Sequence, residues 1–123
     1  METEYFGKLT AMIRLDEHVE NSMQSLIESV RQTDIYQNYI SQRTKVEQQP
    51  ELKQKIDEYR HRNLEIQQNY QGEELLRKMD EFELQYESLC ANPLVDRYLS
   101  AELAMVRMYQ TMEWHLHEGL SLR

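Results

Sequence analysis

The residues best suited to bind a metal are Glu58 and His61, which lie three positions apart. On a helix this spacing places both side chains on one face, and such pairs contribute to the di-iron sites of helical bundles. A complete site needs a second pair of this kind and two further carboxylates, and the sequence contains no second Glu-x-x-His. We therefore expect Glu58 and His61 to be a solvated pair, and we keep a helical bundle with a metal or small-ligand site as the alternative.

The other residues that could do chemistry lack suitable neighbours. His115 and His117 would point about 160° apart on a helix, so they cannot share a metal ion. Glu113 and His117 can face the same way, but two ligands do not make a metal site. The single cysteine, Cys90, supplies one of the four ligands that a zinc or iron–sulfur site normally needs, and we expect a semi-buried thiol. The sequence therefore predicts no bound metal.

Catalysis is not expected either. No serine, threonine or cysteine lies in a recognisable nucleophile setting, and the chain has no glycine-rich phosphate loop. The sequence therefore predicts no catalytic residue, no cofactor and no enzyme activity.

Composition excludes several other classes of protein. The chain of 123 residues suffices for one domain, and with three glycines and two prolines it lacks the turn residues of all-β folds. No apolar run approaches the roughly 20 residues that cross a bilayer, and acids stand near the start where a signal peptide carries bases. We therefore expect a cytoplasmic protein without membrane contact. The net charge of -8 repels phosphate backbones, so no direct nucleic-acid binding is expected.

Helices must position whatever sites exist, because apolar residues recur at helical spacing along the chain. The first predicted helix carries an apolar stripe from Tyr5 through Leu9 to Val30, and it is either continuous or broken near Asp16. Residues that cap or break helices separate the later segments, at Thr33-Asp34, Gln49-Pro50, Gln71-Gly72 and Asn92-Pro93. The other helices are expected at about 35–47, 50–70, 73–89 and 93–118.

These elements predict an all-α fold, a helical bundle of four to five helices with a long C-terminal helix. The whole of residues 1–123 is expected to form a single helical domain, with residues 1–14 as a frayed or separate N-terminal extension. At the start of the long helix, Asn92 is predicted as the N-cap and Pro93 as a first-turn residue.

The long C-terminal helix carries apolar residues over about half its circumference, so it must be covered from two sides. Either it is the central helix of the bundle, or part of its arc packs on a second subunit. We favour a homodimer whose interface includes part of the segment from Leu94 to Leu116. Glu102 and Glu113 lie in the same arc and need partners or an edge position. The predicted core or dimer seam consists of Leu94, Tyr98, Met105, Met108 and Met112.

Leu103 and Trp114 lie on the otherwise polar side of that helix. They are eleven residues apart and therefore nearly aligned along the helix axis. Large apolar residues in line on a polar face are typical of interfaces. We expect them to contact a different protein, with burial of Trp114 by a neighbouring helix as the alternative.

Five short stretches of the sequence carry a resemblance to known proteins: Pro50-Glu51-Leu52, Ile56-Asp57-Glu58-Tyr59-Arg60, Asn92-Pro93-Leu94-Val95, Tyr98-Leu99 and Ala101-Glu102. Together they resemble the YlbF/YmcA family of small helical bacterial proteins. The resemblance covers about residues 16–120. It implies an all-helical, usually dimeric, cytoplasmic regulator without catalytic activity, which works in a complex with related subunits and a further partner. It also implies a role as an accessory factor for ribonuclease Y in mRNA maturation, affecting competence, sporulation and biofilm formation.

Two features depart from the resemblance. Family members tied to iron–sulfur clusters have several cysteines, whereas this chain has Cys90 alone. Leu103 stands where a polar residue is expected, and the stretch up to about Arg14 is additional, which indicates a branch with a different partner. No binding residues can be transferred, because the matching residues look structural. The sequence thus favours a non-enzymatic adaptor that works through other helical subunits, with a purely structural homo-oligomer as a further alternative.

Overall fold

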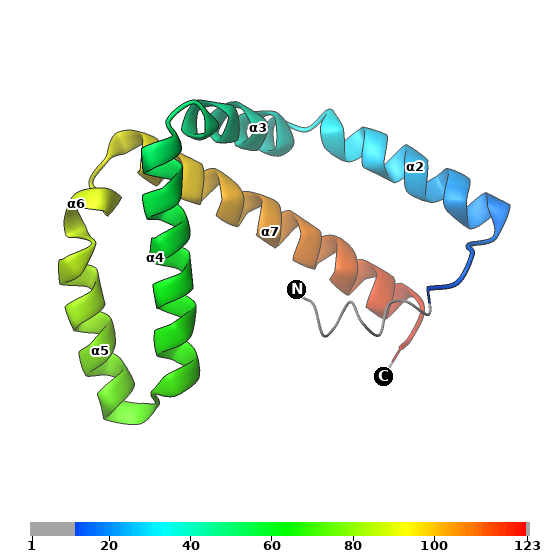
Figure 1. Cartoon of the computed structure of the whole chain (residues 1–123). Coiled ribbons are helices and arrows are strands. Elements are labelled where there is room, and N and C mark those ends of the chain that lie inside the picture. Colours follow the sequence, from blue (N-terminus) through cyan, green and yellow to red (C-terminus); the bar gives the residue numbers. More distant parts are fainter. Residues whose placement is uncertain (1–11, 123) are drawn as a thin grey trace. The chain divides into compact units, whose positions relative to one another are not determined.

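The computed structural model describes residues 12–122, and this part of the chain is helical without a strand. Six helices, α2 to α7, follow one another along it (Figure 1). They fall into two compact units, Met1–Thr33 and Asp34–Arg123. The predicted all-α fold with a long C-terminal helix is confirmed. That residues 1–123 act as one domain stays a prediction.

The first unit contains α2, which spans Glu17–Arg31. The helix begins there because the Asp16 side chain accepts a hydrogen bond from the backbone N–H of His18 at 2.8 Å, which caps the first turn. The apolar stripe that starts at Tyr5 therefore breaks at Asp16, and residues 12–16 are not helical. Tyr5 and Leu9 lie outside the described residues. None of the residues of α2 is buried.

The second unit begins with α3 (Asp34–Glu47) and α4 (Pro50–Asn69), close to the predicted bounds. Pro50 occupies the first turn of α4, where its missing N–H costs no intrahelical hydrogen bond. Gly72 starts α5 (Gly72–Gln85) with a φ of +65°, a left-handed conformation that side chains other than glycine rarely adopt. This turn lets α4 and α5 lie side by side in opposite directions, as Figure 1 shows.

An aromatic cluster holds the α4–α5 hairpin together. The ring of Tyr59 on α4 stacks on Phe82 of α5 with 5.0 Å between centroids, and it meets the edge of Tyr86 at 5.4 Å. Phe82 is buried within this cluster, and Ile66 is a further buried residue of α4. Such aromatic contacts add stability beyond the area that they bury.

The helix predicted at 73–89 is in fact two helices, α5 and the short α6 (Glu87–Cys90). Tyr86 separates them, with φ -106° and ψ 16° outside the helical range. Apolar residues on both sides of the break are packed, although in different places. Tyr86 packs in the aromatic cluster, and Leu89 packs against the core of the unit. Cys90, expected as a semi-buried thiol, is exposed.

The last helix, α7, spans Pro93–Gly119. The Asn92 side chain accepts hydrogen bonds from the backbone N–H groups of Leu94 at 2.9 Å and Val95 at 3.4 Å, and Pro93 follows in the first turn, as predicted. The first half of α7 packs along α3 and on α6. The core of the unit lies there and consists of Val46, Ile56, Val95 and Tyr98.

Candidate protein-interaction surface

Burial along α7 stops about one third of the way along the helix. Its buried residues are Val95, Tyr98 and Ala101, and no residue of α7 after Ala101 is buried in the described structure. At 1.5 Å per residue the helix is about 40 Å long. Its later turns extend away from the α4–α5 hairpin in Figure 1. We call residues 103–119, which are exposed or half-buried, the distal α7 surface.

An ion pair marks the point at which burial ends. The guanidinium of Arg60 on α4 donates a hydrogen bond to the carboxylate of Glu102, and it also lies 5.3 Å from the centroid of the Tyr98 ring. Burial lowers the pKa of Arg60, but the Tyr98 hydroxyl and the charge of Glu102 outweigh it and keep this pKa above its usual value. Glu102 thus has the partner that its place in the apolar arc demands. Glu113, which lies in the same arc, is exposed, so its charge stays in contact with water.

The predicted seam residues divide between the core and the distal α7 surface. Tyr98 is buried and Leu94 packs against the core of its own chain. The methionines of the seam, Met105, Met108 and Met112, are half-buried. Exposed apolar residues lie next to them along the arc, among them Tyr109, which is 63% exposed. Methionine is flexible and polarisable, so this surface can adapt its shape to a partner.

Leu103 and Trp114, predicted to contact another protein, are exposed by 47% and 58%. The indole of Trp114 meets the edge of the neighbouring His115 ring at 5.0 Å and borders a shallow hollow with Arg107 and Gln110. Among the described helices of its own unit, none buries Trp114. Both residues are therefore available to a partner.

The alternative metal site gains no further ligands from the fold. Glu58 and His61 are exposed and border an open depression, whose other charged residues, Asp57 and Arg62, are paired with Lys53 and Glu65. Among the described residues, no three histidine, cysteine, aspartate or glutamate side chains come together in a way that could hold a metal ion. Glu113, His115 and His117 lie on the exposed end of α7. Glu58 and His61 remain two ligands.

A charged cleft of about 190 Å³ between α3, α4 and α7 was not foreseen from the sequence. Its cations could attract an anion, but an acid neutralises each of them. Arg43 pairs with Glu47 at 3.9 Å, Lys53 pairs with Asp57 at 2.9 Å, and Arg60 pairs with Glu102. The cleft therefore offers no excess positive charge.

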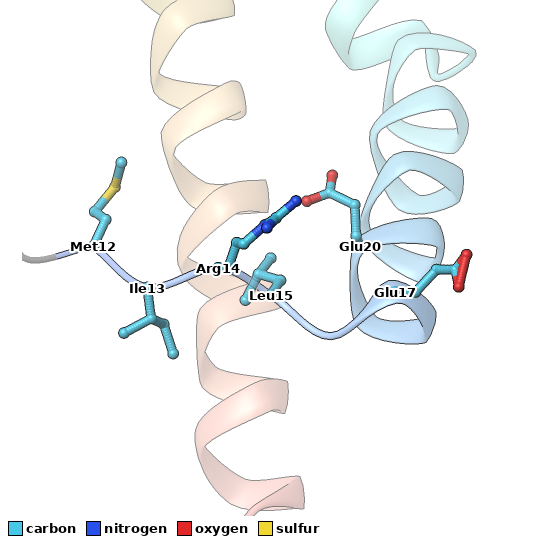
Figure 2. A pocket seen from close by; sticks show the side chains of 6 residues that line it. All are labelled: Met12, Ile13, Arg14, Leu15, Glu17 and Glu20. Atoms are coloured by element: carbon cyan, nitrogen blue, oxygen red, sulfur yellow. The ribbon is translucent and has the colours of Figure 1, made fainter.

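A larger hollow of about 1000 Å³ lies at the start of the first unit. Figure 2 shows its six lining residues, with the side chains of Arg14 and Glu20 pointing toward one another. All six are exposed, so the space is open beside the non-helical segment and encloses no ligand site. In the part of the chain that the structure describes, the helices are also too short or too polar to cross a membrane.

Comparison with known proteins places the chain in a family. The family model described as "Control of competence regulator ComK, YlbF/YmcA" matches residues 19–121. The chain belongs to the YlbF/YmcA family. The match takes in nearly all of α2 and every later helix, so the resemblance carried by Pro50, Asn92 and their neighbours is confirmed. The description of the YlbF/YmcA family, control of a competence regulator, is that of a regulatory protein.

The chain is also similar to a curated protein at low sequence identity. A UPF0342 protein of Caldicellulosiruptor saccharolyticus (strain ATCC 43494 / DSM 8903 / Tp8T 6331) is 24% identical over 101 residues, which cover 80% of this chain and 83% of the relative. No solved structure shows a significant match to the chain.

Proposed function

We propose that this YlbF/YmcA protein is a non-enzymatic regulatory adaptor that works through protein–protein contacts made by its long C-terminal helix. One observation carries the proposal: after Ala101, α7 continues for about 27 Å with exposed apolar side chains and no buried residue. Contiguous exposed apolar surface on a folded chain is typical of an interaction site. Regulation of competence by the family supports the same role.

The first partner is a second copy of the chain. The methionine side of the distal α7 surface, with Met105, Met108 and Met112, would pair with the same side of the other copy. Homodimers usually meet through one self-complementary patch, and a helix seam of this kind fits that symmetry. Burial of these side chains would complete the coverage of the α7 arc.

The second partner is another helical subunit, related to this family, which would bind at Leu103 and Trp114. Tryptophan is among the residues that contribute most to binding energy at interfaces. The family resemblance supports a complex that serves ribonuclease Y-dependent mRNA maturation in the cytoplasm, with effects on competence, sporulation and biofilm formation. The net charge of -8 favours action through proteins rather than direct RNA or DNA contact.

A pull-down from the cells that make the protein tests this partner surface. Trp114→Ala and Leu103→Gln should each abolish recovery of the partner but leave the thermal midpoint within a few degrees, because exposed substitutions cost less than about 0.5 kcal/mol. Gln68→Ala, which changes an exposed glutamine on α4 and leaves α7 intact, is the matched control and should leave recovery unchanged. Full recovery with Trp114→Ala, or a large loss of stability, would contradict the proposed surface.

A further inference from the structure

A second apolar stripe that the described residues leave unburied lies on α2, in the other unit of the chain. Val19, Met23, Leu26 and Val30 follow one another at intervals of four, three and four residues. At 100° per residue they fall within about 60° of the helix circumference and form one narrow seam. Val30 is half-buried and the other three are exposed, Val19 by 48%. An amphipathic helix whose stripe is not buried lacks a partner.

The intervals of this stripe read the same in both directions. If two α2 helices run antiparallel about a two-fold axis between Gln24 and Ser25, Val19 lies opposite Val30 of the second copy. Met23 then lies opposite Leu26 of the second copy. Every apolar residue of the seam therefore meets an apolar residue. The seam is about 16 Å long.

The two edges of the seam fit the same arrangement. On one edge lie Ser22 and Ser29, whose small side chains allow the helices to approach closely. On the other edge lie Ile27, which is half-buried, and the charged residues Glu20 and Arg31. In the antiparallel pair Glu20 comes within about 3 Å, along the helix axis, of the level of Arg31 of the second copy, and the reverse contact forms by symmetry.

Two intrachain contacts of these charged groups lie along the helix surface and are compatible with such a pair. Gln24 donates to Glu20 at 2.9 Å, and Arg31 lies 3.9 Å from Glu28. Both contacts are along the surface of α2 and exposed. Glu28 itself lies on the side of the helix opposite the seam, so it does not oppose the pairing.

We propose that α2 is a second self-association element, which pairs antiparallel with α2 of another copy of this chain. The inference rests on the proposed dimer, because a contact between two helices of 15 residues is marginal by itself. Pairing through the distal α7 surface would hold two copies together and raise the effective concentration of one α2 for the other. The dimer would then have two contacts instead of one.

Cysteine cross-linking of the full chain tests the arrangement. All variants carry Cys90→Ser, because the exposed native thiol would react by itself. The double variant Val19→Cys/Val30→Cys should give a disulfide-linked dimer under mild oxidation. Val19→Cys alone and Val30→Cys alone should not, because in the antiparallel pair each introduced thiol lies about 16 Å from its own copy. Asn21→Cys, on the opposite side of α2, is the control for random collisions.

Light scattering of each variant under reducing conditions separates the two proposals. A dimer in which only the double variant forms the disulfide supports the inference. A dimer that forms no disulfide, or in which Val19→Cys alone links as strongly as the double variant, overturns the α2 pairing and leaves the α7 dimer standing. A monomer that forms no disulfide contradicts both.

Charge exchange provides an independent readout. Glu20→Arg and Arg31→Glu should each weaken α2 cross-linking in the double-cysteine background, because each places like charges across the seam. An equal mixture of the two, unfolded and refolded together, should restore cross-linking, because both charge pairs become attractive again. Failure of the mixture to exceed either variant alone would contradict the proposed register.

Discussion

Arg60 and Glu102 form an ion pair between α4 and α7, one residue after the last buried position of α7. Their side chains are 37% and 31% exposed. The pair therefore stands at the border between the part of α7 that its own chain buries and the distal α7 surface. It anchors the last packed turn of α7 to α4, and the distal α7 surface begins at the next residue.

Removal of this ion pair should cost little stability. In a double-mutant cycle with Arg60→Ala and Glu102→Ala, we expect a coupling free energy of about 1 kcal/mol, because both side chains are partly solvated. The exposed pair Lys53–Asp57 is the matched control and should show a smaller coupling. The free energy of unfolding, measured in urea, provides the values. A coupling of zero between Arg60 and Glu102 would show that the contact is not maintained in solution.

Tyr59 should make stability depend on pH in the alkaline range. Burial, followed by the neighbouring Cys90, raises the pKa of Tyr59 above its usual 10.0. The folded state therefore holds this proton more tightly than the unfolded chain. Its contribution is complete below pH 10 and is lost as the pH rises through the folded pKa. The free energy of unfolding should fall more steeply above pH 10 in the wild type than in Tyr59→Phe. Equal slopes would contradict the prediction.

Of the two glycines that the structure describes, Gly72 should be the one that the fold requires. Its φ of +65° disfavours any residue with a Cβ, although no atom lies within 4 Å of the position that a Cβ would take. Gly72→Ala should therefore lower the free energy of unfolding by about 1 kcal/mol through backbone conformation alone. Gly119→Ala, at the end of α7 with equally open surroundings, is the matched control and should be neutral or slightly stabilising. Equal effects would contradict this assignment.

Gln42 should be replaceable with a gain in stability. It is buried on α3, and its side-chain oxygen has no hydrogen-bond partner among the described residues, although its amide nitrogen donates to Asn38 at 3.2 Å. Gln42→Leu should raise the free energy of unfolding by about 0.5–1 kcal/mol, because an unpaired buried carbonyl is removed. Gln67→Leu is the matched control, because Gln67 makes the same contact to Asn63 on an exposed face. A loss of more than about 1 kcal/mol with Gln42→Leu would show that the oxygen is satisfied in solution.

Local sequence signals were sufficient to predict most helix bounds. Pro50 and the Asn92-Pro93 pair act within one helical turn, through a fixed φ or a side-chain cap, so they determine where α4 and α7 begin. The break at Tyr86 was missed, because no glycine or proline marks it and the apolar stripe runs on to Leu89.

Contacts between distant residues could not be predicted from one sequence. The need of Glu102 for a partner was evident from its place in the apolar arc, but nothing local points to Arg60, 42 residues earlier. The buried Gln42 was likewise missed, because a glutamine in a polar helix usually faces water. The exposure of Leu103 and Trp114 could be predicted from their spacing. Both lie on a helix that continues beyond the turns buried by the rest of its unit.

Replacement of seam methionines should disrupt self-association. Met105→Glu/Met112→Glu places two charges in the proposed α7 seam, where burial of an unpaired charge is unfavourable. We expect a monomer that keeps its helical circular dichroism, because both residues are only half-buried within the chain. Gln110→Glu, on the same helix outside the methionine side, is the control and should leave the oligomeric state unchanged. A dimer that persists in the double variant would place the contact elsewhere.

The most direct test of the central claim is the solution mass of the wild-type protein. Light scattering coupled to gel filtration at micromolar concentration measures it without any substitution. If the distal α7 surface binds a second copy, the mass should be twice the chain mass of 14.9 kDa. A clean monomer with strong helical circular dichroism would contradict the claim that this surface is a self-association site.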